Sequence, residues 1–160
     1  LSQAEQIPVA RLTSEAVDAY QAAVDAIEAG KLVGVYPEGT LTRDPDLWPM
    51  RGKTGAVRLA MAGGIPVIPM AHWGSQQVLP RYCKLKLWPL RRRVRVLIGD
   101  PVDLSAYAGS DNPSAALVAA TDTVMARIAA LLSQLRGEPA PAERWNPAEH
   151  GQKETGRLES

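Results

Sequence analysis

The chain has 160 residues, 46% of them hydrophobic, which is enough for one domain with a hydrophobic core and too few to expect two. The formal net charge is +1, and the single cysteine, Cys83, excludes an internal disulfide and favours a reducing, cytoplasmic setting. No cluster of cysteine and histidine has the spacing of metal ligands, so we expect no metal site.

The first predicted elements are a helix and a strand. Apolar residues recur at helical spacing from Ser14 to Ala29, with Ser14 placed to cap the helix and Gly30 placed to end it. The run KLVGVY, residues 31–36, predicts a buried strand that stops at Pro37, whose nitrogen cannot donate to a strand ladder. The residues after Pro37 therefore stand at the carboxyl end of a strand.

A proline-rich loop at residues 41–52 precedes a second helix and a second strand. TGAVRLAMAGG, residues 54–64, predicts a short helix ended by its glycines, and IPVIPMA, residues 65–71, predicts another buried strand. VRVLIGDPVDL, residues 94–104, predicts a third strand that runs into a turn. This alternation predicts an α/β fold with a mostly parallel sheet flanked by helices.

A long helix and a polar tail complete the chain. Asn112 and Pro113 are placed to open the helix, and Gly137 is placed to end it. Its expected buried stripe consists of Leu117, Thr121, Val124, Ile128, Leu131 and Leu135. Residues 138–160 have too little apolar material to repay the entropy of ordering, so we expect a disordered or loosely docked tail behind a domain of residues 1–137.

Membrane contact is expected to be peripheral. No uninterrupted apolar run approaches the roughly 20 residues that cross a bilayer, because Asp122 and Arg127 interrupt the last helix. The segment RYCKLKLWPLRRR, residues 81–93, carries six basic residues and no acidic ones, beside leucines and Trp88. This mixture fits an anionic membrane surface better than a nucleic-acid backbone, and a solvated cationic edge strand is the alternative.

Pro-Glu-Gly-Thr, which follows the first predicted strand, is the best candidate for a site, because ligands of open α/β sheets collect at the carboxyl ends of strands. Glu38 can accept hydrogen bonds from hydroxyl groups, Gly39 lets backbone N–H groups approach a ligand, and Thr40 adds a donor. The cations that follow are Arg43, Arg51 and Lys53. Together these groups suit a hydroxylated, phosphorylated small molecule, and a solvated turn with scattered charges is the alternative.

Other chemistries have weaker support in the sequence. RGKTG, residues 51–55, is similar to the end of a P-loop, but Leu47 occupies the place of its first glycine. His72 follows the second predicted strand and is expected to be a hydrogen-bonding residue at a strand end, while His150 lies in the polar tail. From its residues alone, the chain has an anion-binding site without a convincing general base.

The sequence resembles the 1-acylglycerol-3-phosphate acyltransferase family over roughly residues 5–137. Tyr36–Thr40, "YPEGT", is similar to the family's third block and is followed by "RGKTGAVRLA". "QIPVAR", which ends at Arg11, resembles the second block, and "IPVIP", with Pro69, resembles the fourth. Within this family, the sequence most resembles the actinobacterial members.

The resemblance implies transfer of a fatty acyl group from acyl-CoA to the hydroxyl of glycerol-3-phosphate or lysophosphatidate in phospholipid synthesis. It implies no cofactor besides acyl-CoA as co-substrate, no nucleic acid, and peripheral contact with an anionic membrane at its cytoplasmic face. The residues that it implies for substrate binding are Arg11, Glu38, Gly39, Thr40, Arg43 and Lys53.

The family's catalytic block, a histidine followed after four residues by an aspartate, is absent from this sequence, because Gln77 stands five residues after His72 and Thr155 five residues after His150. In the family this histidine deprotonates the acceptor hydroxyl. We therefore assign no catalytic residue and expect an amino-terminally truncated enzyme that is inactive by itself. A non-catalytic phospholipid-binding module or pseudoenzyme is the alternative.

Overall fold

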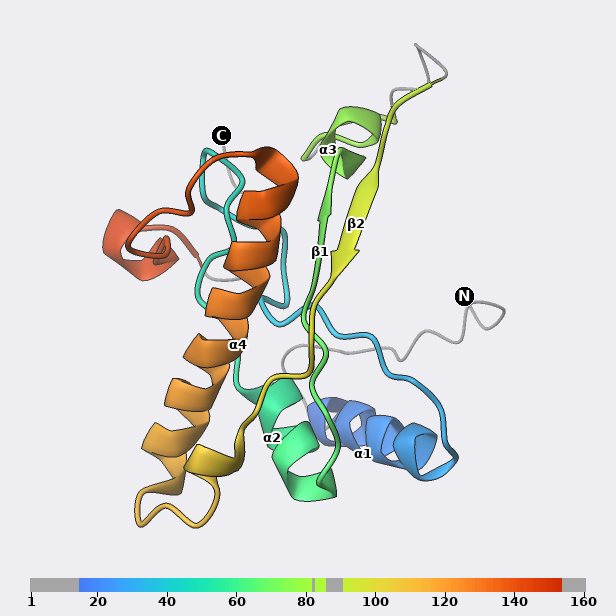
Figure 1. Cartoon of the computed structure of the whole chain (residues 1–160), viewed down its shortest axis with the longest axis vertical. Helices are drawn as coiled ribbons and strands as arrows, with labels where there is room; N and C mark the ends of the chain where they lie inside the picture. The colour runs from blue at the N-terminus through green and yellow to red at the C-terminus, as the bar shows by residue number, and fades with distance from the viewer. Residues whose placement is uncertain (1–14, 82, 86–90, 154–160) are drawn as a thin grey trace.

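The computed structural model describes residues 15–81, 83–85 and 91–153, and their regular elements are arranged as Figure 1 shows. In chain order the elements are α1 (Glu15–Glu28), α2 (Gly55–Gly63), β1 (Met70–Trp73), α3 (Ser75–Val78), β2 (Arg95–Ile98), the 3₁₀ helix η2 (Ser105–Tyr107), α4 (Pro113–Arg136) and the 3₁₀ helix η3 (Pro147–His150). The helices predicted at 14–29, 54–64 and 113–136 are confirmed as α1, α2 and α4, although Ser14 lies outside the described residues.

Local signals set the ends of α4. The Asn112 side chain accepts a hydrogen bond from the backbone N–H of Ala115 at 3.1 Å, and Pro113 occupies the first turn, where no helical partner for its nitrogen is needed. At the other end Gly137 adopts φ 76° and donates its N–H to the Ser133 carbonyl. A left-handed residue at this position is costly for side chains other than glycine, so the helix ends here.

The sheet differs from the expected one. β1 and β2 pair antiparallel, with Met70 opposite Ile98 and His72 opposite Val96. The expectation of a mostly parallel sheet is therefore not met by the described strands. Parallel neighbours need a crossover that returns the chain to the same end of the sheet, but here β2, which follows the short helix α3 in the sequence, runs in the opposite direction beside β1 (Figure 1).

Residues 31–36 do not form the strand that their composition predicts. No strand pairing occurs along this segment in the part of the chain that the structure describes. The side chain of Leu32 is 92% exposed and that of Tyr36 is 76% exposed, so the expected burial is wrong as well. A β-branched run favours the extended backbone, but a strand also needs a neighbour to accept its hydrogen bonds.

The second predicted strand begins later than the sequence indicates. β1 starts at Met70, because the prolines at 66 and 69 have no N–H to donate to a ladder. Antiparallel contact still extends beyond the strands through a bridge between Val67 and Val102. The hydrogen bond from the Gly99 N–H to the Pro69 carbonyl, 2.9 Å long, continues the same pairing.

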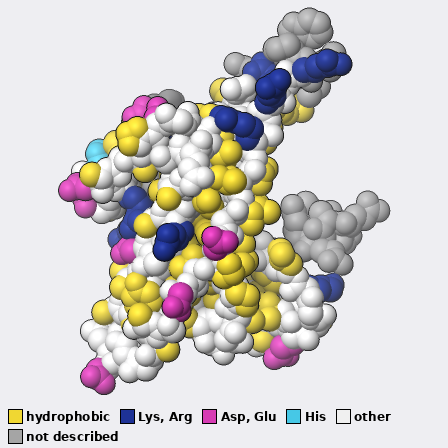
Figure 2. Space-filling view, in the orientation of Figure 1, with side chains coloured by type: hydrophobic (Ala, Val, Ile, Leu, Met, Phe, Trp, Pro, Cys, Tyr) yellow, Lys and Arg dark blue, Asp and Glu magenta, His cyan; other side chains and the backbone are white. Residues whose placement is uncertain are grey.

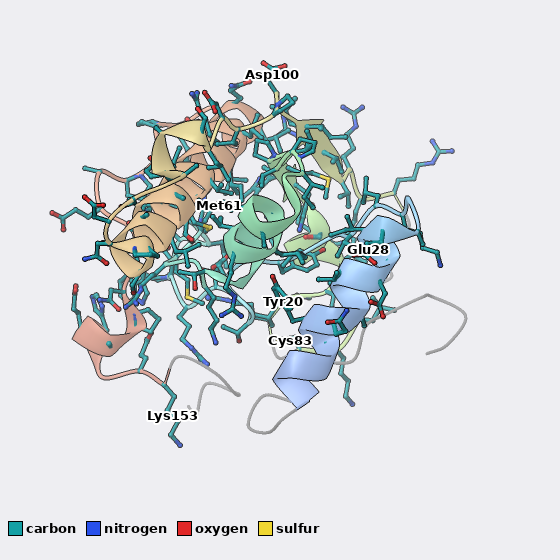
Figure 3. All side chains as sticks on the ribbon, turned by 90° about the horizontal axis from the view of Figure 1, so that it is seen from below. Tyr20, Glu28, Met61, Cys83, Asp100 and Lys153 are labelled. Atoms are coloured by element: carbon teal, nitrogen blue, oxygen red, sulfur yellow. The ribbon has the colours of Figure 1, made fainter. Side chains whose placement is uncertain are left out.

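Helix α4 joins two hydrophobic clusters formed by the described residues. One cluster contains Trp48, Ala71, Leu132 and Leu135, and the other contains Val57, Val102, Ala120 and Val124. The predicted buried stripe of α4 is thus confirmed at Val124 and Leu135, which belong to these clusters. Helix α2 lies between α4 and α1, as the view from below shows (Figure 3).

By length and composition alone α4 would be long enough and apolar enough to cross a membrane. In this structure, however, one face of the helix packs against the strand pair and α2. A core helix passes the same test, so this property is weak support for a membrane span.

Candidate anion-binding site

The Pro-Glu-Gly turn has a defined geometry. The Gly39 N–H donates to the Tyr36 carbonyl at 3.0 Å, and Gly39 adopts φ 66°. This is the left-handed region, which a glycine enters without strain. A β-carbon at Gly39 would lie 3.5 Å from Cδ of Lys53, so the Lys53 side chain lies directly beside the turn.

Two hydrogen bonds join the turn to the segment 50–53. The Lys53 N–H donates to the Pro37 carbonyl at 2.8 Å, and the Met50 N–H donates to Oε2 of Glu38 at 3.1 Å. One bond is between backbone groups and the other uses the carboxylate itself. The turn and the following cationic segment therefore form a single unit, although Met50 comes twelve positions after Glu38 in the sequence.

Burial raises the pKa of Glu38 to about 7. Loss of hydration is the largest cause, and the charge of Asp44 acts in the same direction. Hydrogen bonds from the Met50 N–H and from Thr42 lower the pKa and offset part of this effect. Near neutral pH Glu38 is consequently present both as a carboxylate and as a carboxylic acid, so it can accept or donate a hydrogen bond toward a hydroxyl group.

Polar groups of the loop itself and the side chain of Arg81 hold the loop after the turn in place. The Thr42 hydroxyl donates to the Trp48 carbonyl at 2.6 Å, and Oδ1 of Asp44 accepts from the Asp46 N–H at 2.7 Å. Arg81 donates to the carbonyls of Thr42 and Asp44 at 2.6 and 3.0 Å. These bonds hold residues 42–48 in a compact loop against the core.

The structure brings together some of the site residues that the sequence predicts. Glu38, Gly39 and Lys53 meet at the turn, and Thr40 follows it, partly buried. Arg43 is only 3% exposed, so its side chain belongs to the interior of the loop. Arg11 lies outside the described residues.

The histidines make contacts within the protein. Nδ1 of His72 lies 3.1 Å from the Ser75 hydroxyl, which confirms a hydrogen-bonding residue at a strand end. Its ring also meets the ring of Tyr36 edge-on, with 6.4 Å between the centroids. His150 stacks on Trp145 at a centroid distance of 3.5 Å. Among the described residues, no group of three or more His, Cys, Asp or Glu side chains is placed to hold a metal ion.

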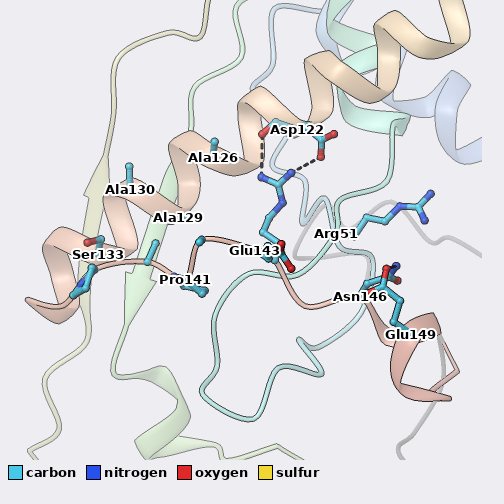
Figure 4. Close-up of a pocket in the computed structure, with 14 residues that line it drawn as sticks. Arg51, Asp122, Ala126, Ala129, Ala130, Ser133, Pro141, Glu143, Asn146 and Glu149 are labelled. Atoms are coloured by element: carbon cyan, nitrogen blue, oxygen red, sulfur yellow. Dashed lines mark hydrogen bonds and ion pairs between the residues drawn. The ribbon is translucent and has the colours of Figure 1, made fainter.

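The sequence predicts a disordered or loosely docked tail but does not indicate where the tail would dock. Residues 138–153 lie along α4 and η3 forms part of them, with Pro147 buried and Ala140 packed on the Trp48 cluster. Together with α4 they enclose a groove of about 760 Å³ that reaches Arg51 (Figure 4). The only sequence signal for this docking was an aromatic residue, Trp145, in a polar segment.

Comparisons with known proteins find acyltransferases. Residues 1–73 match the family model described as Acyltransferase. A chloroplastic 1-acyl-sn-glycerol-3-phosphate acyltransferase from Brassica napus, BAT2, is 31% identical over 75 residues, which are 46% of this chain and 21% of that protein. A 1-acyl-sn-glycerol-3-phosphate acyltransferase from Bacillus subtilis is 27% identical over 112 residues, 70% of this chain and 50% of that protein. No solved structure matches the chain.

Residues 1–73, which include the whole Pro-Glu-Gly turn and Lys53, are thus similar to the acyltransferase family. The two relatives share the name 1-acyl-sn-glycerol-3-phosphate acyltransferase. The matched part of the chain corresponds to half or less of the length of each relative.

Proposed function

We propose that this chain binds the phosphorylated acceptor of an acyl transfer from acyl-CoA to the hydroxyl of glycerol-3-phosphate or lysophosphatidate. The observation that carries the proposal is the hydrogen-bonded unit formed by the turn and residues 50–53, which contains both Glu38 and Lys53. The carboxyl group of Glu38 suits the acceptor's hydroxyl, and the ammonium group of Lys53 suits its phosphate. The names of the two relatives support this choice of acceptor.

In the proposed reaction, the acceptor oxygen attacks the thioester carbonyl carbon of acyl-CoA. An ester C–O bond forms, the C–S bond breaks, and the thiol of coenzyme A leaves with the proton from the hydroxyl. Glu38, Gly39, Thr40 and Lys53 would bind and orient the acceptor. The sequence contains no histidine followed after four residues by an aspartate, so we assign the proton transfer to no residue of this chain.

Contact with an anionic membrane at its cytoplasmic face belongs to the same proposal, because an acylated acceptor resides in a bilayer. Exposed cations, among them Arg91 and Arg93, gather on the projecting end of the strand pair (Figure 2). Trp88 and the leucines at 87 and 90, which the sequence analysis placed in the same surface, lie outside the described residues. Cations beside apolar side chains are typical of peripheral membrane contacts.

Binding of glycerol-3-phosphate to the 160-residue chain, measured by isothermal titration calorimetry, tests the proposed acceptor site. We expect Glu38→Ala and Lys53→Ala each to weaken binding by about ten- to a hundredfold, because each removes one charge-assisted hydrogen bond, worth roughly 1.5–3 kcal/mol. Glu28→Ala, which removes an exposed carboxylate from α1, is the matched control and should bind as the parent does. Equal affinity for all four proteins would refute the site.

Release of coenzyme A thiol from acyl-CoA in the presence of lysophosphatidate distinguishes an active enzyme from a non-catalytic phospholipid-binding module. A chain that binds the acceptor without releasing thiol would agree with a missing general base, as would a non-catalytic phospholipid-binding module. Turnover by the chain alone would show that a residue within it moves the proton. In that case a loss of turnover in Glu38→Gln would identify that residue.

A further inference from the structure

The tail forms a strap, residues 138–150, that is fastened to the middle of α4. The guanidinium of Arg144 donates to the backbone carbonyl of Asp122 at 3.2 Å and forms an ion pair with its carboxylate (Figure 4). Pro147, three residues further on, is buried and belongs to the same stretch of the strap. Arg144 is thus an anchor that connects a polar tail to a helix of the core.

This anchor stands next to a backbone contact with the candidate site. The carbonyl of Trp145, which follows Arg144 directly, accepts a hydrogen bond from the Arg51 N–H at 3.3 Å. Arg51 in turn follows Met50, whose own N–H donates to Glu38. The segment 50–53 is therefore held between the Pro-Glu-Gly turn on one side and the strap on the other.

The side chain of Arg51 is exposed at one end of the groove between the strap and α4 (Figure 4). It forms no ion pair within the part of the chain that the structure describes, whereas Arg144 is engaged with Asp122. Glu149, which lines the same groove, accepts a hydrogen bond from the Asn146 side chain at 2.7 Å. The guanidinium of Arg51 is consequently open to an anion from outside the protein.

We infer that the strap is part of the acceptor site: Arg144 is a positioning residue that keeps Arg51 beside the Pro-Glu-Gly turn, where its guanidinium binds the phosphate together with Lys53. The inference rests on the proposed function, which uses only the turn and residues 50–53, and it adds a role for residues 138–150. Releasing the strap removes the partner of the Arg51 N–H and lets the cationic segment move. Binding of a phosphate then has to order a more mobile segment, which costs more conformational entropy and lowers the affinity.

The test is the affinity of the 160-residue chain for glycerol-3-phosphate and, separately, for inorganic phosphate, in the parent and in Arg144→Gln. An exposed ion pair and one backbone hydrogen bond are each weak, so we expect a loss of about three- to tenfold in affinity. Arg144→Lys keeps the charge but not both contacts with Asp122, and should fall between the parent and Arg144→Gln. Arg127→Gln removes an exposed arginine from α4, the helix that carries Asp122, and is the matched control.

Amide hydrogen exchange gives a second readout, which needs no ligand. The Arg51 amide should exchange faster in Arg144→Gln than in the parent, while the amide of Val124 in the core of α4 keeps its rate. This contrast distinguishes a local release of the strap from general destabilisation.

The outcomes separate the inference from the proposed function. If the parent binds glycerol-3-phosphate and Arg144→Gln binds it with the same affinity, the positioning role is wrong and the acceptor site stands. If the parent binds neither probe, the proposed function fails, and the inference fails with it. Weaker binding in Arg144→Gln together with faster exchange at Arg51, and neither effect in Arg127→Gln, supports the inference.

Discussion

Glu38 is a carboxyl group placed where its charge is disfavoured, at the junction of the turn and the segment 50–53. The bond from the Met50 N–H stabilises the carboxylate but does not fully replace the water lost on burial. The folded chain therefore retains a proton on Glu38 to higher pH than the unfolded chain does. A group of this kind costs stability when it is ionised, and such a cost is tolerated where a site needs the group.

The sign of this effect predicts how stability depends on pH. Because the pKa of Glu38 rises from 4.5 in the unfolded chain to about 7 in the folded one, its contribution to stability is fully present below pH 4.5 and is lost as the pH rises to about 7. The loss is at most about 3 kcal/mol. We expect Glu38→Gln, which has no such proton, to remove this part of the pH dependence, as measured by urea unfolding between pH 5 and pH 8.

The parent and Glu38→Gln should therefore differ most at pH 8, where the variant is the more stable protein. Glu28→Gln, at an exposed position of α1, should keep the parent's pH dependence. Parallel stability curves for the parent and Glu38→Gln would contradict the raised pKa.

At the scale of elements, α4 connects the two hydrophobic clusters, the strand pair and the strap. Its last turn is fixed by Arg136, whose guanidinium lies over the rings of Trp48 and Trp73, 4.2 and 4.4 Å from their centroids. The same side chain donates to the Asp46 carbonyl at 2.7 Å. Cation–π contacts with two rings attach the helix to the loop after the turn and to β1 at once.

The buried face of α4 can be tested by one pair of substitutions. Val124 is 5% exposed and packs in a hydrophobic cluster, whereas Val118 on the same helix is 46% exposed. We expect Val124→Asp to lower the free energy of unfolding by more than about 4 kcal/mol, because it buries a carboxylate without a partner. Val118→Asp makes the same chemical change in solvent and should cost less than about 1 kcal/mol. Similar melting curves for the two variants would show that the helix face is wrongly assigned.

At the scale of the whole molecule, the strand pair has two unlike faces. Ala71, Trp73 and Leu97 pack toward α4, while Met70, Val96 and Ile98 are exposed on the other face. Cations gather at the projecting end of this strand pair (Figure 2), and the exposed Arg91 and Arg93 directly precede β2. Apolar side chains flanked by cations form a surface that an anionic bilayer can bind.

Co-sedimentation with lipid vesicles tests this surface. Each cation near an anionic bilayer contributes about 1 kcal/mol at low salt, so the double variant Arg91→Gln/Arg93→Gln should bind anionic vesicles roughly tenfold more weakly or worse. Vesicles of neutral lipid should distinguish the two proteins much less. The variant Lys31→Gln/Arg127→Gln removes two charges elsewhere and serves as the control. Unchanged binding of the first variant would place membrane contact on another surface.

The sequence by itself determined the elements whose causes are local. The caps and apolar spacing of α4 and the glycines that end α2 depend on residues within a few positions of one another, so they can be read in order along the chain. The proposed ligand groups of Glu38 and Lys53 can also be chosen in this way, since their residue types are visible before any contact is known.

Only the tertiary structure decided the features that need a distant partner. The direction of strand pairing, the exposure of residues 31–36, the burial of Arg43 and the docking of the strap on Asp122 each depend on what lies beside a segment in space. A β-branched run favours the extended backbone whether or not a neighbour is present, and a polar tail binds wherever its few apolar and charged groups are matched. The residue types of a segment indicate whether it can pair or pack. Which partner it meets is decided only when the whole chain folds.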